Sequence, residues 1–163
     1  HFDLMIDAFA ESKAQESCDL IILGDGELRE ELQSQINRLG MQDKVHLPGR
    51  LKNPFRYMKN AEFMALSSRA EGFPMVMIEA LTLKCPVIAT DCPTGPREII
   101  QNEVNGLLIE IDNKQLLTES IDRLYFDEAL RKTLSDNAQD SVTHLSVENI
   151  CNEWVKLSKT NQP

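Results

Sequence analysis

The sequence predicts an α/β protein, with a Rossmann-like parallel sheet that helices cover on both faces. Two observations lead to this fold class. Amphipathic helical segments alternate with short apolar runs along the chain, and the runs are almost continuously apolar, as expected of strands buried on both faces. Glycine and proline then follow several of these runs. Because ligands of such sheets bind beyond the carboxyl ends of the strands, we expect a ligand crevice at that edge.

The N-terminal half of the chain contains three helix–strand units. Apolar residues recur at helical spacing from Phe2 to Phe9, and a second amphipathic pattern is closed by Gly40. Short apolar runs follow the helices and stop at Gly24 or at Pro48 and Gly49. The expected elements are a helix over 2–9, a strand over 18–23, a helix over 28–39, a strand over 45–47, a helix over 53–61 and a strand over 63–66.

The C-terminal half continues the alternation and ends in helices. The expected elements are a helix over 74–83, a strand over 86–90, a helix over 96–100, a strand over 105–109, and helices over 114–125, 128–141 and 147–157. Apolar residues on the last helix (Ile150, Trp154 and Leu157) predict core packing. The loops over 24–27, 48–51, 67–73 and 91–97 each follow a strand, so one crevice would collect all four.

The helix expected after residue 73 carries two informative carboxylates. Pro74 suits a first helical position, which places the helix start at Phe73 or Pro74 and Glu71 in the preceding loop. From Met75 onward the helix is apolar on almost every face, which predicts burial all round, with Glu79 as its single charge. A buried carboxylate needs donors, either ligand hydroxyls or an arginine in an ordinary core. The helix N-terminus favours an anion such as phosphate.

Composition limits the remaining possibilities. A chain of 163 residues is long enough for one domain, and its net charge of −9 argues against general affinity for nucleic acid. The sequence contains no DxD motif and no His/Cys/Asp cluster with ligand spacing, so no metal is expected. Four cysteines without metal-site spacing predict free thiols in a reducing cytoplasm: Cys18, Cys85, Cys92 and Cys151. Four cations lie in or near the crevice loops: Arg50, Lys52, Arg69 and Arg97.

The string from Arg69 to Leu81 resembles the E-x7-E region of GT-B glycosyltransferases. It is most similar to the large retaining group, glycosyl transferases group 1, which holds a nucleotide sugar in its C-terminal domain. Segments 2–9, 23–26, 47–50, 91–99 and 105–108 resemble the same group. The resemblance implies that residues 1–163 form a C-terminal donor-binding domain, with its C-terminal helices from about residue 114 onward. It also offers a second interpretation of the last helix, with Ile150, Trp154 and Leu157, as the helix that crosses back toward the N-terminal domain of such enzymes.

The resemblance also implies roles for individual residues. Glu71 would contact the hydroxyls of the donor sugar and serve as the catalytic residue, whereas Glu79 would hold the ribose hydroxyls. Further residues would surround the sugar and phosphates, line the nucleobase or lie near the sugar: Gly72, Phe73, Pro74 and Met75; Gly49, Arg50 and Leu51; and Thr94 and Gly95.

The chain departs from the family pattern at one end. In this family a strand and a Gly-Arg…Lys-Gly segment precede the helix that begins here at Phe2, and their Arg and Lys bind the pyrophosphate. The resemblance therefore implies a GT-B half without its first strand, and we expect this chain alone to be inactive. The missing strand would be central in the sheet, which calls the integrity of the sheet into question.

Similarity to the family also sets the expected partners. The donor would be a nucleotide sugar, with a UDP-sugar expected and no other cofactor. A glycan or lipid-linked acceptor would be held by an N-terminal domain of the same polypeptide, and transfer would retain configuration. The location would be cytoplasmic, with peripheral contact at the inner membrane through that domain. Three alternatives remain at this stage: a sugar-nucleotide epimerase, a phosphorylase on the same fold, or a non-catalytic nucleotide-binding subunit.

Overall fold

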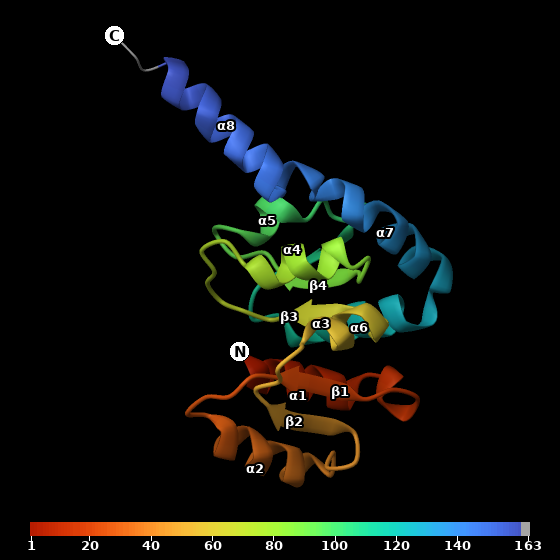
Figure 1. The fold of residues 1–163 in the computed structure, drawn as a ribbon. Helices are drawn as coiled ribbons and strands as arrows, with labels where there is room; N and C mark the ends of the chain where they lie inside the picture. The colour runs from red at the N-terminus through yellow and green to blue at the C-terminus, as the bar shows by residue number, and fades with distance from the viewer. Residues whose placement is uncertain (161–163) are drawn as a thin grey trace.

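Within residues 1–160, which the computed structural model describes, the chain forms five strands and eight α-helices (Figure 1). The strands are β1 (Leu20–Leu23), β2 (Val45–Gly49), β3 (Met64–Leu66), β4 (Val87–Thr90) and β5 (Gly106–Ile109). The helices are α1 (Phe2–Glu11), α2 (Arg29–Leu39), α3 (Phe55–Asn60), α4 (Met75–Thr82), α5 (Pro96–Ile99), α6 (Lys114–Phe126), α7 (Glu128–Ser141) and α8 (Val147–Thr160). Every predicted strand and helix is present, with ends shifted by a few residues. Two 3₁₀ turns, η1 (Ala14–Glu16) and η2 (Thr143–Leu145), were not predicted.

All strand pairs are parallel, which confirms the predicted fold class, but the strands form two sheets rather than one. One sheet has the order β1-β2 and the other the order β3-β4-β5. Figure 1 shows the two sheets at different levels of the molecule, with β1 and β2 below the other three strands. Among the described residues, β1 and β3 each pair with a strand on one side only. The division falls where the resemblance places a central first strand.

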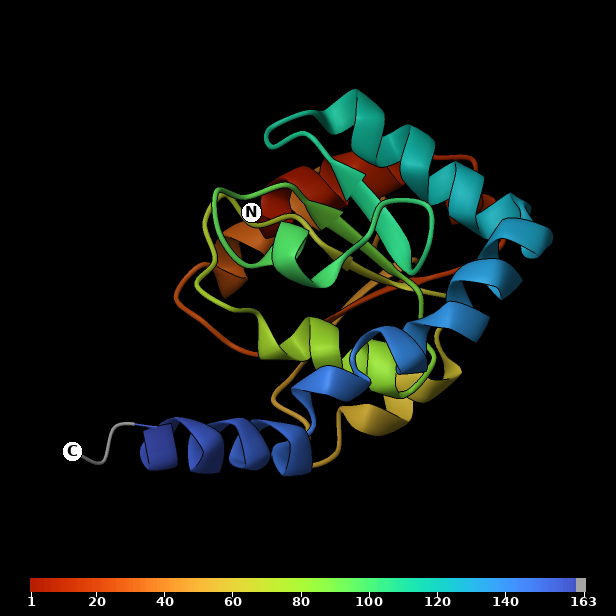
Figure 2. The same cartoon turned by 90° about the horizontal axis from the view of Figure 1, so that it is seen from above.

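Helices cover both faces of the strands. On β4, Ile88 packs in a cluster with α1 and α6, whereas Val87 and Ala89 pack with α4 and α5, as the period-two geometry of a strand requires. Figure 2 shows this layering, with red α1 and teal α6 on one side of the strands and the yellow and yellow-green α3 and α4 on the other. The first cluster also contains residues of β1 and β2. The helical layer of α1 and α6 therefore joins the two sheets through one apolar core.

The helix ends follow local sequence signals. Gly40 ends α2 with φ +70°, and the N–H of Met41 returns to the carbonyl of Ile36, so the predicted glycine cap is confirmed. The side chain of Asn113 accepts from the N–H of Leu116 at the start of α6. Asp127 caps α7 in the same way, accepting from the N–H of Leu130.

Helix α4 differs from the prediction in two respects. It begins at Met75, and Pro74 is its N-cap with ψ 93°, because a residue before the first turn keeps an extended backbone. The helix is not buried all round. Met77, Ala80 and Leu81 are buried, whereas Met75 is 58% exposed and Glu79 is only half-buried. One stripe along α4 therefore stays open at the edge that carries the site loops.

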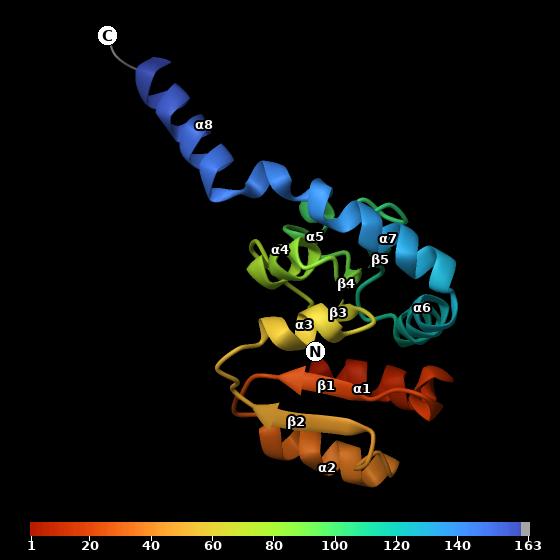
Figure 3. The ribbon, with the colours of Figure 1, turned by 45° about the vertical axis from the view of Figure 1, so that its right-hand side comes forward.

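Helix α8 extends away from the body of the molecule (Figure 3). The prediction of core packing for its apolar stripe is wrong, because Trp154 is 70% exposed and Leu157 is 57% exposed. Periodicity identifies an apolar face but not the surface that covers it. None of the described helices is both long enough and apolar enough to span a lipid bilayer.

Candidate functional site

At the carboxyl edge of each sheet, hydrogen bonds join the loops that follow its strands. The N–H of Gly24, after β1, donates to the carbonyl of Gly49 at 3.0 Å. The N–H of Asp91, after β4, donates to the carbonyl of Ile109 at the end of β5, at 2.7 Å. Nε of Arg69, after β3, lies 2.7 Å from Oδ1 of Asp112. The structure thus brings the predicted crevice loops to one side of the sheets, in two groups that correspond to the two sheets.

Glu71 lies in the loop between β3 and α4, as predicted, and is partly buried. Its carboxylate oxygen Oε1 accepts a hydrogen bond from the Ser68 hydroxyl at 2.6 Å. Its backbone carbonyl accepts from the Thr94 hydroxyl, also at 2.6 Å. Both the side chain and the backbone of Glu71 are therefore fixed by neighbouring hydroxyls, while one carboxylate oxygen is left for other donors.

Glu79 lies one helical turn into α4 and is half-buried. No described residue provides a hydrogen bond or an ion pair to its carboxylate. The alternative interpretation, an arginine partner in an ordinary core, is therefore not what the structure shows. A carboxylate that has no protein partner and is open to solvent is available to ligand hydroxyls, which can form charge-assisted hydrogen bonds to it.

The start of α4 lies between the two glutamates. The N–H groups of Met75 and Val76 have no intrahelical acceptor, as at any helix N-terminus, so they can donate to an anion. Gly72 and Phe73 are exposed beside them, and Pro74 is buried. The residues expected around the sugar and phosphates therefore form the segment that connects the Glu71 loop to α4.

Gly95 brings the loop after β4 against this segment. Its φ is +88°, and a Cβ placed on it would lie 2.7 Å from both the Gly72 carbonyl oxygen and Cδ of Pro74. Only glycine allows so close an approach. The structure therefore brings the predicted residues Thr94 and Gly95 together with the Glu71 loop.

The predicted nucleobase residues lie apart from this cluster. Gly49 ends β2 with φ +78°, Arg50 is exposed and Leu51 is half-buried. Among residues 1–160, no hydrogen bond or ion pair joins 49–51 to the loop over 67–73. The two groups of site residues belong to different sheets.

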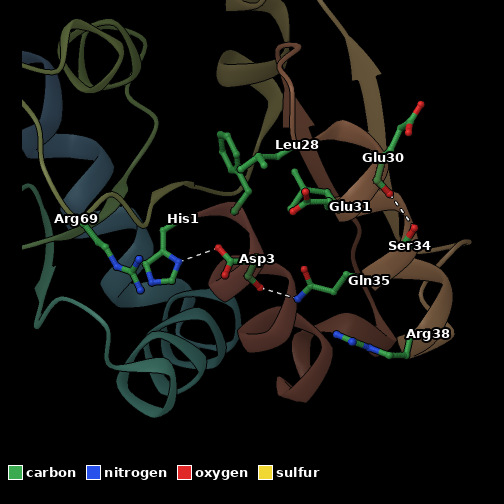
Figure 4. Close-up of a pocket in the computed structure, with 11 residues that line it drawn as sticks. His1, Asp3, Leu28, Glu30, Glu31, Ser34, Gln35, Arg38 and Arg69 are labelled. Carbon is green, nitrogen blue, oxygen red and sulfur yellow. Dashed lines mark hydrogen bonds and ion pairs between the residues drawn. The ribbon is translucent and has the colours of Figure 1, made fainter.

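A cavity of about 930 Å³ opens near the start of α1 (Figure 4). It is lined by His1 before α1, Asp3 of α1, Leu28 and Glu31 from the α2 side, and Arg69 from the loop after β3. Figure 4 shows His1 and Arg69 on one side of the cavity and the α2 side chains on the other. No sequence motif pointed to this cavity, because its walls come from segments that are distant in the chain. Of the predicted crevice loops, only the loop over 67–73 lines it, through Arg69.

The four predicted cations differ in their surroundings. Arg97 makes two hydrogen bonds to Asp91, at 2.9 and 2.8 Å, and Arg69 is paired with Asp112. Hydrogen bonding from Arg69 holds the pKa of Asp112 below its ordinary value. Arg50 and Lys52 are exposed. Among the described residues, no group of three or more His, Cys, Asp or Glu side chains is arranged to hold a metal ion.

Two residues outside the predicted site hold the Glu71 loop in place. The Thr90 hydroxyl and the Cys92 thiol both donate to the carbonyl of Ser68. The signal that could have drawn attention to them is the presence of hydrogen-bonding side chains at every second position, Thr90, Cys92 and Thr94, around the predicted end of a strand.

Comparison with known proteins gives consistent results. The family model described as Glycosyl transferases group 1 matches residues 1–141. An uncharacterized glycosyltransferase of Methanocaldococcus jannaschii is 38% identical, over 85% of this chain and 41% of that protein. The N-acetylgalactosamine-N,N'-diacetylbacillosaminyl-diphospho-undecaprenol 4-alpha-N-acetylgalactosaminyltransferase of Campylobacter jejuni is also 38% identical, over 83% of this chain and 37% of that protein.

A solved structure shows the same arrangement of helices and strands. Anabaena HepE, crystallised in complex with UDP-glucose, superposes with a TM-score of 0.87 at 28% identity. The match covers 96% of this chain and 44% of the HepE chain. The chain thus spans about two fifths of the length of these relatives.

Proposed function

The chain belongs to the glycosyl transferases group 1 family, and from this membership we propose that it binds the nucleotide-sugar donor of a retaining glycosyltransferase. The donor is a nucleoside diphosphate sugar, and the UDP-glucose complex of HepE supports a UDP-sugar. The Campylobacter jejuni relative is named for an undecaprenol-linked saccharide, which supports a glycan or lipid-linked acceptor. A further domain of the complete polypeptide binds that acceptor.

One observation supports this proposal above the others. Glu79 is a half-buried residue whose carboxylate pairs with no described residue, and it lies one turn behind a helix N-terminus. In this assignment its oxygens accept hydrogen bonds from the two ribose hydroxyls. The diphosphate then lies against the first-turn N–H groups of α4, whose partial positive charge favours it.

The sugar lies toward Glu71 in the same assignment. Ser68 holds one carboxylate oxygen of Glu71, so the other oxygen is oriented toward a sugar hydroxyl without further ordering. As the bond to the diphosphate breaks, positive charge spreads over the sugar ring and negative charge grows on the diphosphate. Preorganised dipoles at α4 stabilise the leaving group, and the acceptor attacks from the same face.

Substitution of each glutamate separates the two roles. In the complete enzyme, Glu79→Ala should weaken binding of UDP by about 1.5–3 kcal/mol, the usual scale for a charged hydrogen-bond partner. Glu71→Ala should leave UDP binding unchanged but reduce turnover of the nucleotide sugar. Calorimetry with UDP and transfer assays with UDP-sugar measure the two effects.

Glu119→Ala is the matched control, because Glu119 is an exposed glutamate on α6 whose carboxylate, among the described residues, bonds only to Gln115. Equal losses of UDP affinity in both glutamate variants would contradict the division of labour. If the full polypeptide instead converts the donor to its epimer, the protein is a sugar-nucleotide epimerase. If it binds the nucleotide but transfers no sugar, the protein is a non-catalytic subunit.

The proposal also predicts the behaviour of residues 1–163 expressed alone. A helix N-terminus contributes about 0.3–1 kcal/mol toward a diphosphate, which is small beside the net charge of −9. We expect weak UDP binding, no sugar transfer, and no metal requirement because the sequence lacks DxD. Sustained sugar transfer by residues 1–163 to a soluble acceptor would contradict this prediction and show that this chain alone contains all the groups needed for transfer.

A further inference from the structure

The loop that carries Glu71 is fixed by three side chains from the end of β4 and the segment after it. The Thr90 hydroxyl and the Cys92 thiol donate to the carbonyl of Ser68, at 2.5 and 3.0 Å. The Thr94 hydroxyl donates to the carbonyl of Glu71 at 2.6 Å. Thr90 is the last residue of β4, and Cys92 and Thr94 lie in the loop that follows it. Together they donate to two carbonyls of the neighbouring loop, those of Ser68 and Glu71.

Two of these contacts are buried and protected from water. Thr90 and Cys92 are 1% and 0% exposed, so water does not compete for their donors. A thiol is a weak donor and normally packs as a small apolar group. Here its sulfur lies within hydrogen-bond distance of the same carbonyl that accepts from Thr90, so two side chains hold one peptide group.

The fixed peptide group is directly connected to the carboxylate. Ser68, whose carbonyl receives both donors, uses its own hydroxyl to hold Oε1 of Glu71 at 2.6 Å. The Thr94 hydroxyl donates to the backbone carbonyl of Glu71 itself. Rotation of the loop would therefore break several contacts together.

We propose that Thr90, Cys92 and Thr94 are positioning residues that hold the Glu71 carboxylate in the orientation needed for the donor sugar. This inference rests on the role proposed above for Glu71. None of the three needs to touch the substrate: they act through Ser68 and through the backbone of Glu71.

Thr94 provides the cleanest test because it is exposed, so its hydroxyl can be removed with little effect on the core. In the complete enzyme, Thr94→Val should lower kcat with the UDP-sugar about tenfold to a hundredfold, the cost of a small misplacement of a reacting group. The dissociation constant for UDP should stay unchanged. Thr94→Ser keeps the hydroxyl and should retain most of the activity.

A double-mutant cycle separates positioning from a direct or purely structural role. If Thr94 acts through Glu71, Thr94→Val should cause no further loss of kcat in a Glu71→Gln background. Cys92→Ala and Cys92→Ser form a second pair, in which only the serine variant keeps a donor. We expect the serine variant to keep a higher kcat than the alanine variant at equal thermal midpoint.

The outcomes distinguish the two proposals. Suppose that Glu71→Gln lowers kcat and that Thr94→Val lowers kcat by the same factor in the Glu71→Gln background as in the parent. This result would overturn the positioning role and leave the proposed function intact. Loss of UDP affinity in Thr94→Val, in parallel with kcat, would also overturn it. Normal turnover by Glu71→Gln would overturn the role proposed for the Glu71 carboxylate and the positioning role with it, and would leave the proposed binding of the nucleotide sugar at Glu79 and α4 intact.

Discussion

Single residues decide how closely the loops at the carboxyl edge approach one another. Gly95 has a positive φ and lies against Gly72 and Pro74, where a side chain would meet backbone. Arg69 and His1 both contact Oδ1 of Asp112, and the Ser67 hydroxyl donates to the carbonyl of His1. These contacts tie the start of α1 to the loops after β3 and β5.

Substitution of Gly95 should disturb the site and the fold together. Gly95→Ala places a methyl group 2.7 Å from two fixed atoms and forces alanine into a conformation that it rarely adopts. We expect a loss of about 1–3 kcal/mol in the free energy of unfolding, measured by urea denaturation. Gly26→Ala is the control, because no atom lies within 4 Å of its added Cβ. Equal stability of the two variants would contradict the close packing of the loops.

The contact between Arg69 and Asp112 should make stability depend on acid pH. The hydrogen bond from Arg69 lowers the pKa of Asp112 below its ordinary value of 3.8. The charged carboxylate of Asp112 thus stabilises the fold fully above pH 3.8, and this stabilisation is lost as the pH falls through the lowered pKa of Asp112. The thermal midpoint of the parent should exceed that of Asp112→Asn at pH 7, and the difference should shrink below pH 3.8. The difference in thermal midpoint between the parent and Arg69→Met should likewise shrink as the pH falls. A difference that stays the same at all pH values would show that ionisation of Asp112 does not contribute to stability.

At the scale of elements, the last two helices have opposite relations to the core. Leu134 and Ala138 of α7 are fully buried, and Arg131 of the same helix donates to the carbonyls of Leu124 and Tyr125 at the end of α6. Helix α8 has the stronger apolar periodicity, yet its apolar side chains are exposed among the described residues. The contacts that a helix makes with the core, rather than the apolar periodicity of its sequence, therefore decide whether it stabilises the domain.

Substitutions in the two helices should differ accordingly. Leu134→Ala removes a fully buried side chain and should cost about 2–5 kcal/mol of unfolding free energy. Trp154→Ala, although it removes a larger side chain, should change this free energy by less than about 0.5 kcal/mol, because Trp154 is 70% exposed. Urea denaturation of residues 1–163 measures both. A large loss for Trp154→Ala would mean that α8 folds back onto the domain in solution.

At the scale of the whole molecule, one helical layer joins two separate sheets. Met5, Ile6 and Phe9 of α1 share a core with residues of β1, β2, β4 and β5. In the three-stranded sheet, the strand beside the division is less buried than the central strand: the three residues of β3 are half-buried, whereas all four of β4 are buried. The joint between the sheets rests on side-chain packing rather than on strand pairing.

Hydrogen exchange should record this difference. Strand β4 pairs with a strand on each side, so its amide hydrogens should exchange more slowly than those of β1 and β3, which have one unpaired edge. In β1 and β3, alternate amides face the division and should exchange fastest. Mass spectrometry of deuterated peptides or NMR would resolve the strands. Uniform protection across all five strands would show that β1 and β3 pair in solution.

Much of this protein follows from local sequence patterns. The order of helices and strands, the glycine cap of α2 and the Glu71–Glu79 spacing depend on residues that are close in the chain. The family resemblance added the grouping of Glu71 with Thr94 and Gly95, which the structure brings together.

Other features were decided only by tertiary structure. The division into two sheets, the open stripe of α4 and the exposed face of α8 depend on which distant segments meet. The donors from Thr90 and Cys92 to Ser68 likewise join residues more than twenty positions apart. Periodicity specifies that a face is apolar or that side chains share one side, but only long-range packing specifies the atoms opposite them.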